Sequence, residues 1–199
     1  MSILGRIATA LCYSDRREAS LQRHLQPHLP PGASILDLGA GSCKLAKRLA
    51  MHGDLDVTAV DVVDHRCTDF PLELYDGTRL PFADNQFDIS TLVFALHHAP
   101  DPRSLLLEAT RVTRSALLIV EDSPRNSLER RLWRAWDYSL NHESHSDILV
   151  AHEAMGISEW ERFFRDASLS PRSAVTFRLF FPVLCSYRHA LFHVPLKRH

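Results

Sequence analysis

The stretch Ser34-Ile-Leu-Asp-Leu-Gly-Ala-Gly-Ser-Cys43 decides the fold. Its apolar part, Ile35 to Leu38, carries one acid and lies between Pro-Pro-Gly and Gly-Ala-Gly, which is typical of a short buried strand. From Lys44 to Ala50 the apolar residues take helical spacing. The order strand, glycine turn, helix predicts a ligand site, because glycines let the backbone approach a ligand and a helix start presents unpaired N–H groups.

Two kinds of nucleotide cofactor suit a turn of this type. A dinucleotide-binding turn reads Gly-x-Gly-x-x-Gly, and its third glycine would fall at Lys44, whose long cationic side chain disfavours a nicotinamide or flavin site. The alternative is the acid-x-Gly-x-Gly turn of S-adenosylmethionine (SAM) methyltransferases, supplied here by Asp37, Gly39 and Gly41. A Gly-x-Gly turn is weak evidence alone, since many are plain tight turns, so the downstream chain has to decide.

The composition is that of one ordinary globular domain. The 199 residues are 45% hydrophobic and 24% charged, with a net charge of −1, so no global field favours nucleic acid or an anionic membrane. Four scattered cysteines without a Cys-x-x-Cys pair indicate reduced thiols, with neither disulfides nor a zinc site. With no long apolar run, we expect a cytoplasmic protein without stable membrane insertion. The oligomeric state stays open.

Strand-like and helical segments alternate from residue 33 to residue 122, which predicts an α/β fold with a doubly wound, Rossmann-like sheet, mostly parallel. The expected strands are 35–38, 56–60, 72–75, 87–94 and 116–120, with helices at 44–50 and 103–113. We expect a single domain in three parts: a helical cover at 1–32, a ligand-binding core at 33–122, and a final part at 123–199. That last part has helices at 127–140 and 157–164, the latter capped by Ser158, a polar loop from Asn141, and a closing antiparallel hairpin bent at Pro182.

Polar residues follow the predicted strands. In a doubly wound sheet, ligands bind beyond the carboxyl ends of the strands. An acid at the tip of the second strand, Asp61, can accept both hydroxyls of a ribose, because a carboxylate offers two acceptor oxygens. The other residues at these ends are Gly39, Asp76, His97, His98, Glu121 and Asp122. Their convergence predicts one site.

Five motifs in order carry a resemblance to a known family: Ile35-Leu-Asp-Leu-Gly-Ala-Gly, Val60-Asp61, the Leu80-Pro-Phe-Ala-Asp-Asn-Gln-Phe-Asp run after Asp76, Leu96-His-His, and Glu108-Ala-Thr-Arg-Val. Over residues 33–122 the chain resembles class I SAM-dependent methyltransferases, in the broad group that includes the ubiquinone/menaquinone-biosynthesis methyltransferases. It departs from the family pattern at Cys43, where a third glycine is usual, at Tyr75, and at Thr113-Arg-Ser115 in place of Pro-Gly-Gly.

The resemblance implies SAM as cofactor, with S-adenosylhomocysteine (SAH) as product, and implies roles for individual residues. The glycine turn would approach the methionine part of SAM, Asp37 would orient its amino group, and Asp61 would bind its ribose. Val62 would lie against the adenine, with Asp76 and Gly77 at the adenine rim. The complete set of expected cofactor-binding residues is Asp37, Gly39, Ala40, Gly41, Asp61, Val62, Asp76, Gly77 and Phe94.

Catalytic and acceptor-binding residues are expected on the later part of the chain. His97 and His98 follow the fourth strand and are placed to face the transferred methyl group, as a base or as packing and capping residues, with His98 favoured by the family pattern. Trp133 and Trp136 share a helix face, which indicates core packing or an aromatic acceptor wall. His142 and His145 could line the acceptor pocket or lie in a solvated segment, and a metal site there is disfavoured.

These observations favour a methyltransferase that acts on O, N or C of a small-molecule metabolite by in-line displacement. The alternative is a methyltransferase-like protein that binds SAM or a nucleoside without turnover. A nucleic-acid or protein substrate is disfavoured by the near-neutral charge and by Phe94-Ala-Leu-His-His, which stands where an amino-methylating enzyme would carry an Asn-Pro-Pro-Tyr type of motif.

Overall fold

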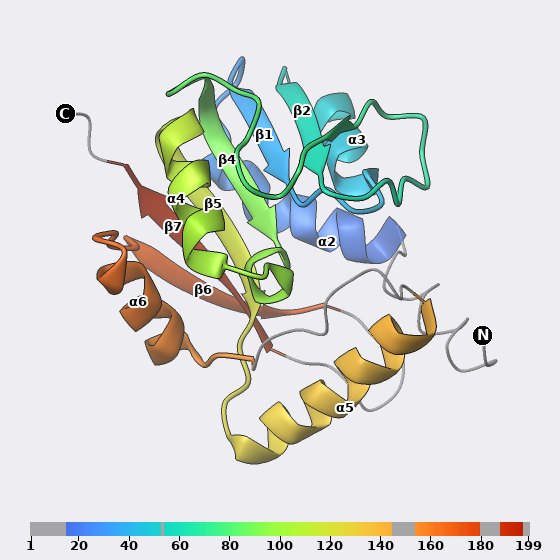
Figure 1. Cartoon of the computed structure of the whole chain (residues 1–199), viewed down its shortest axis with the longest axis vertical. Helices are drawn as coiled ribbons and strands as arrows, with labels where there is room; N and C mark the ends of the chain where they lie inside the picture. Colours follow the sequence, from blue (N-terminus) through green and yellow to red (C-terminus); the bar gives the residue numbers. More distant parts are fainter. Residues whose placement is uncertain (1–14, 53, 145–153, 180–187, 197–199) are drawn as a thin grey trace.

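A seven-stranded sheet with the order β3-β2-β1-β4-β5-β7-β6 forms the centre of the molecule (Figure 1). This computed structural model describes residues 15–52, 54–144, 154–179 and 188–196, and only the backbone of residues 136–144. The strands are β1 (Ser34–Leu38), β2 (Asp56–Asp61), β3 (Glu73–Leu74), β4 (Phe87–Val93), β5 (Thr113–Asp122), β6 (Ser173–Arg178) and β7 (Arg188–Pro195). β1 to β5 are parallel, and β7 runs antiparallel to both β5 and β6. The predicted fold class is confirmed.

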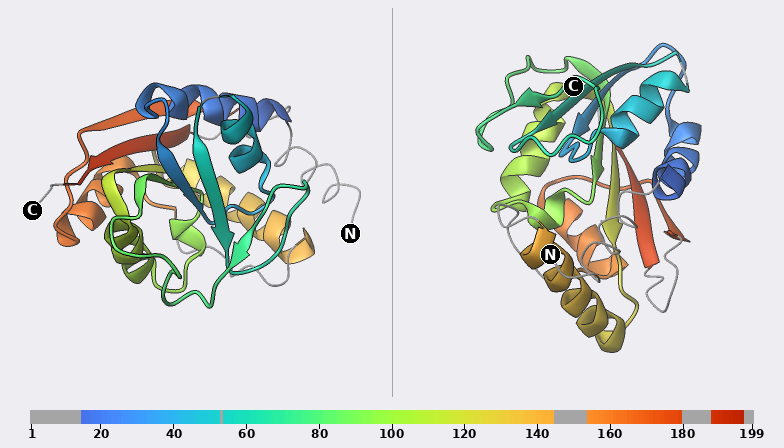
Figure 2. Two further views of the ribbon diagram at one scale, coloured as in Figure 1. Left: turned by 90° about the horizontal axis from the view of Figure 1, so that it is seen from above. Right: turned by 90° about the vertical axis from the view of Figure 1, so that its right-hand side faces the viewer.

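Helices cover both faces of the sheet (Figure 2). The helical elements are α2 (Asp15–Leu25), η1 (Gln26–His28), α3 (Lys44–Met51), η2 (Leu96–His98), α4 (Pro102–Val112), α5 (Ser127–Ser144) and α6 (Ile157–Asp166). One core lies between the sheet and α4 with α6, and another lies between the sheet and α2 with α3. The segment between β2 and β3, residues 62–72, contains no helix.

Side-chain alternation along the strands assigns each residue to a face. Leu117 and Ile119 of β5 pack toward α4 and α6, whereas Leu118 and Val120 pack toward α2. On β1, Ile35 packs in the α2 core, so Asp37 lies on that same face. The polar residues at the strand ends therefore reach the site from two sides of the sheet.

Three predicted boundaries were wrong. β5 begins at Thr113 rather than residue 116, because Thr113 Oγ1 donates to the Ala109 carbonyl at 2.6 Å and the chain passes from α4 into the strand without a loop. α5 continues to Ser144, so the first part of the expected polar loop is helical. The cap of α6 is Gly156 rather than Ser158, since the Gly156 N–H donates to Glu159 Oε2 at 2.6 Å. Pro182 lies outside the described residues.

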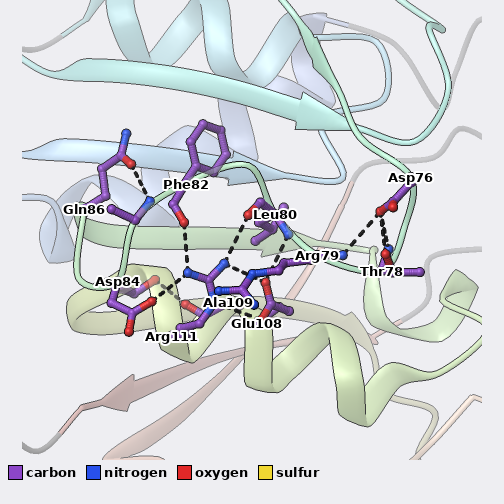
Figure 3. A network of polar contacts seen from close by, with 12 residues as sticks. Asp76, Thr78, Arg79, Leu80, Phe82, Asp84, Gln86, Glu108, Ala109 and Arg111 are labelled. Carbon is purple, nitrogen blue, oxygen red and sulfur yellow. Dashed lines mark hydrogen bonds and ion pairs between the residues drawn. The ribbon is translucent and has the colours of Figure 1, made fainter.

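A network of polar contacts holds the segment between β3 and β4 against α4 (Figure 3). The guanidinium of Arg111 donates to the carbonyls of Leu80 and Phe82, at 3.1 and 2.9 Å, and to the carboxylates of Asp84 and Glu108, both at 2.8 Å. Glu108 in turn accepts the Leu80 N–H at 3.0 Å. The network fixes the segment that begins at Asp76.

The glycine turn after β1 packs directly on the end of β4. Gly39 has φ +78°, and a Cβ at this position would lie 2.8 Å from the Cβ of Ala95. Gly41 also has a left-handed backbone, with φ +50°, but a Cβ there would meet no atom within 4 Å. Cys43 adopts φ 56° while fully buried, so a side chain occupies a conformation that favours glycine where the family has one.

Arg111→Ala should lower the free energy of unfolding by about 2–3 kcal/mol, because the loss of charge-assisted hydrogen bonds leaves two carboxylates and two carbonyls without their donor. Urea unfolding followed by circular dichroism measures this. Arg114→Ala is the matched control: Arg114 is half-exposed and reaches the carbonyls of Asn85 and Gln86 at 3.3 and 3.2 Å, so a change below about 1 kcal/mol is expected. Equal losses in the two variants would contradict this account of the network.

Gly39→Ala should destabilise the protein by about 2–4 kcal/mol, since the new methyl group overlaps Ala95 and alanine is strained at positive φ. Gly41→Ala carries the backbone strain alone and should cost about 1 kcal/mol. Thermal unfolding of the two variants, side by side with the parent, measures the difference. A smaller loss for Gly39→Ala than for Gly41→Ala would rule out the proposed close packing.

Candidate functional site

The glycine turn and the end of β2 are joined by hydrogen bonds. The N–H groups of Gly39 and Ala40 donate to the Val60 carbonyl at 2.9 and 3.2 Å. The Gly41 N–H donates to Asp61 Oδ2 at 2.7 Å. The predicted proximity of Asp61 to the turn is therefore present in the structure.

The carboxylate of Asp61 is oriented by backbone donors. Besides Gly41, the N–H groups of Val62 and Val63 donate to Asp61 Oδ1 at 2.7 and 3.4 Å. A carboxylate has about four lone-pair sites, so a half-buried group held in this way retains acceptor capacity for a hydroxyl. It is suited to a ribose placed above the turn.

Asp37 is a buried acid below the glycine turn, with Thr91 Oγ1 donating to its Oδ1 at 2.7 Å. Burial raises the pKa of Asp37 to about 7, against the lowering effect of the Thr91 hydrogen bond, and the negative charges of Glu18 and Asp61 add to the rise. A cationic group placed nearby would favour the ionised form. Asp37 can thus lose its proton and form an ion pair with the ammonium group of an amino-acid ligand.

The expected adenine side brings Val62 and Gly77 together. Gly77 has φ +80°, and a Cβ there would lie 3.4 Å from Val62 Cγ1, while the Val62 side chain is 51% exposed. Asp76 closes its own turn: its Oδ1 accepts from the Thr78 N–H at 2.8 Å and the Thr78 hydroxyl at 2.7 Å (Figure 3). These bonds lower the pKa of Asp76. Its contact with adenine stays a prediction.

Phe94 lies at the end of β4 in a strained backbone conformation. Its φ is +57°, which is an outlier for a bulky residue, and its N–H donates to the Val120 carbonyl at 2.8 Å. The guanidinium carbon of Arg17, from α2, lies 5.0 Å from the centre of the Phe94 ring. Strain of this kind at a strand end is common in functional sites.

His97 forms a buried pair with Glu121. His97 Nδ1 hydrogen-bonds to Glu121 Oε2, and Glu121 Oε1 accepts the Leu96 N–H at 2.9 Å. Both side chains are buried, and the ring of His98 lies 4.1 Å from that of His97 between centroids. A carboxylate beside Nδ1 favours the tautomer that carries its proton on that nitrogen.

Asp122 and His189 form a second pair that sequence analysis did not predict as a unit. His189 Nδ1 lies 2.7 Å from Asp122 Oδ1, and the two residues are register partners on β7 and β5. Trp133, one of the expected acceptor residues, hydrogen-bonds Asp122 and contacts the His97 ring edge-on at 5.8 Å. In the sequence, only the predicted antiparallel hairpin at the end of the chain pointed toward His189. Such a hairpin brings the start of its last strand beside the end of β5.

The remaining expected acceptor residues are not placed as side chains. Trp136 and His142 lie on α5, within the part described by its backbone alone, and His145 lies outside the described residues. In Figure 1, α5 lies at the side of the molecule toward which the arrows of β4 and β5 point. The predicted contact of Trp136, His142 and His145 with an acceptor stays a prediction.

The residues at this edge suit SAM. The open space beside Gly41 gives room at the turn, where a Cβ would meet nothing. Asp37 and Asp61 offer carboxylates to an ammonium group and to ribose hydroxyls, at the ends of adjacent strands. Within the described ranges there is no group of three or more metal-ligating side chains, and no helix has the length and hydropathy to cross a membrane.

Comparison with known proteins supports the same conclusion. Residues 36–119 match the family described as "Methyltransferase domain". A demethylmenaquinone methyltransferase of Renibacterium salmoninarum is 32% identical over 145 residues, covering 65% of this chain and 61% of that protein. One of Paenarthrobacter aurescens is 40% identical over 101 residues, covering 46% and 40%. The chain thus spans roughly two fifths to three fifths of these relatives.

Solved structures agree on the fold. A SAM-dependent methyltransferase from Methanosarcina mazei has a TM-score of 0.66 at 17% identity, covering 86% of this chain and 96% of that one. Another from Aquifex aeolicus has a TM-score of 0.67 at 16% identity, covering 96% and 98%. Together with the strand order and the glycine turn, these findings show that the chain has the fold of SAM-dependent methyltransferases and is similar to methyltransferases over residues 36–119, which indicates SAM as its cofactor.

Proposed function

We propose that this chain transfers a methyl group from SAM to a small-molecule acceptor bound beside His97. The observation that carries the proposal is the buried His97–Glu121 pair, which lies at the same edge of the sheet as the glycine turn and Asp61. A base at this position faces the acceptor, because the cofactor turn belongs to β1 and His97 follows the adjacent strand β4.

Several residues would hold the cofactor. Gly39 to Gly41 would take the methionine part, Asp37 its amino group, and Asp61 the ribose hydroxyls. The adenine would lie against Val62 and Gly77. When bound, SAM supplies a methyl group on a cationic sulfur, which leaves with the electron pair of the broken carbon–sulfur bond. The protein contributes alignment and exclusion of water.

His97 would activate an acceptor that arrives as a hydroxyl. With its Nδ1 proton directed to Glu121, the imidazole takes the acceptor proton at Nε2. The buried Glu121 carboxylate then stabilises the imidazolium that forms, and the Leu96 N–H keeps that carboxylate in place. Glu121 acts through His97 and is a positioning residue, while His98 packs beside the His97 ring.

An aromatic acceptor suits the side chains at this position. Phe94, His97 and the buried Trp133 present aromatic surface around the same point, with Phe94 edge-on to His97 at 6.3 Å. The relatives named demethylmenaquinone methyltransferases act on a quinone-type compound by their name. From these aromatic side chains and the names of the relatives, we assign this chain a hydroxyl-bearing aromatic acceptor. Residues after 122 would line the part of the site that holds this acceptor.

SAH should bind about tenfold more weakly at pH 6 than at pH 8, because the carboxyl of Asp37, with a pKa of about 7, must lose its proton to hold the ligand's ammonium group. Isothermal titration calorimetry at both pH values measures the ratio. Asp37→Asn should bind weakly at both, and Asp56→Asn, an exposed acid at the opposite end of β2, should follow the parent. Absence of any SAH binding would exclude the cofactor assignment.

His97→Ala should lower kcat by about 10²–10⁴, the usual worth of a general base, while the Kd for SAH changes less than about threefold. The assay follows methyl-labelled SAM with 1,4-naphthalenediol kept reduced under argon. Glu121→Gln should lower kcat less and move the pH profile, since it keeps the imidazole in place without the charge. His52→Ala, exposed at the end of α3, is the control. SAH binding with no turnover in the parent would favour the non-catalytic alternative.

A further inference from the structure

Helix α5 lies at the rim of the molecule, and the first half of this helix meets the rest of the chain through few side chains (Figure 1). Among residues 127–135, whose side chains the structure describes, only Trp133 is buried. Trp133 hydrogen-bonds Asp122, and Arg130 forms an ion pair with Glu159 of α6. These contacts establish which face of α5 is turned toward the domain.

The other face of α5 presents apolar side chains to solvent. Leu128 is 64% exposed, Leu132 is 54% exposed, and Ala135 is exposed as well. Residues spaced by three or four positions lie along one side of a helix, so these three form a continuous apolar stripe. Trp133 comes five residues after Leu128, which places it about 140° away around the helix axis. A single exposed leucine needs no explanation, but leucines on adjacent turns form a patch that a partner can cover.

Positive charge is concentrated beside this apolar stripe, although the whole chain has a net charge of −1. Residues 125–135 contain four arginines and one acid. Arg131 lies three residues after Leu128, so the two are neighbours on the helix surface, and Arg134 is exposed on the next turn. The acid, Glu129, pairs with Arg125, which precedes the helix. The apolar stripe is therefore bordered by exposed guanidinium groups.

The combination of leucines and arginines indicates the kind of partner. A helix that lies in the surface of a membrane has an apolar stripe that enters the boundary of the acyl chains, and arginines that meet anionic headgroups. A nucleic acid would use the arginines but would leave Leu128 and Leu132 in water. A second copy of this chain would bring the same arginines close to one another, which is unfavourable. An anionic bilayer complements both the apolar and the charged part of this surface.

We propose that the first half of α5, residues 125–135, docks on the surface of an anionic lipid bilayer. Leu128, Leu132 and Ala135 enter the boundary between headgroups and acyl chains, while Arg131 and Arg134 meet lipid phosphates. The helix lies on the bilayer and does not cross it. Since α5 lies at the side of the molecule toward which β4 and β5 point, docking directs the carboxyl ends of these strands toward the lipid (Figure 1). The inference goes beyond the proposed function and does not depend on which molecule accepts the methyl group.

Flotation of the full chain with two kinds of vesicle tests the proposal: phosphatidylcholine alone, and phosphatidylcholine with about 30% phosphatidylglycerol. The chain should float only with the second kind at about 0.1 M salt. Binding should weaken about tenfold or more at about 1 M salt, where the Debye length falls from about 10 Å to about 3 Å. Leu128→Ser combined with Leu132→Ser should weaken binding about tenfold or more, because the apolar stripe is lost. Arg131→Gln should weaken it about fivefold.

Leu107→Ser and Arg103→Gln are the matched controls, since both residues are exposed on α4, outside this surface, and Leu107 is 46% exposed. Both variants should bind the vesicles as the parent does. The Kd for SAH without vesicles should be the same in the parent and in every variant. Failure of the proposed function is separate, because the parent would then not bind SAH or would transfer no methyl group.

Four results would overturn the inference. The first is absence of flotation with the anionic vesicles, and the second is equal flotation with phosphatidylcholine alone. The third is vesicle binding that survives the changes of Leu128 and Leu132, which would assign the arginines to a polyanion such as nucleic acid. The fourth is a dimer of the parent, measured by analytical ultracentrifugation without lipid, that dissociates when the two leucines are changed.

Discussion

A carboxylate that is removed from water at the end of a strand has to find a partner, and this constraint shapes the whole site. Desolvation disfavours a buried charge strongly, so an acid in such a place is protonated, hydrogen-bonded or paired. Burial raises the pKa of Asp37 to about 7, so this acid is partly protonated near neutral pH, and it accepts a hydrogen bond from Thr91. Glu121 is paired with His97, and Asp122 is paired with His189. The histidines that pair with these acids are also the side chains that can take up and release protons.

The two histidines converge because Glu121 and Asp122 are consecutive residues of one strand. Successive side chains of β5 point to opposite faces of the sheet, so His97 meets Glu121 on the α4 side and His189 meets Asp122 on the α2 side. At the end of the strand the two faces meet, and there Phe94 contacts both imidazole rings. The positive φ of Phe94 turns the chain at this point and directs the Leu96–His98 turn back toward β5.

Much of this arrangement could be predicted from the sequence, because it depends on local signals. The apolar run at Ile35, the glycine turn and the acid at Asp61 establish β1, β2 and their shared ligand edge, and the Gly41–Asp61 hydrogen bond follows from them. The cofactor-binding roles of these residues stay predictions, although their proximity is present in the structure.

What could not be predicted depends on pairings between distant segments. His189 meets Asp122, 67 residues before it in the chain, only because β7 returns antiparallel beside β5, and nothing near His189 in the sequence indicates this pairing. The start of β5 at Thr113 was missed for a local reason. The Thr113 hydroxyl donates to the Ala109 carbonyl in the last turn of α4, and the chain enters the strand without the loop that was expected there. Asp76 is the opposite case. Its side chain has a predicted ligand role, but it also accepts the N–H of Thr78 within its own turn.

The two edges of the sheet differ in a way that stability alone does not explain. At the amino ends of the strands, Asp88 Oδ2 accepts from both the N–H and the hydroxyl of Ser34, at 3.0 and 2.9 Å, and these bonds lower the pKa of Asp88. At the carboxyl ends, Asp37 is held near neutrality, Phe94 is strained and His189 Nε2 has no partner among the described residues. Each of these features costs free energy in the folded chain. The backbone strain at Phe94 and the unmet hydrogen bond at His189 therefore lie at the same edge as the glycine turn, and strain of this kind clusters at ligand sites.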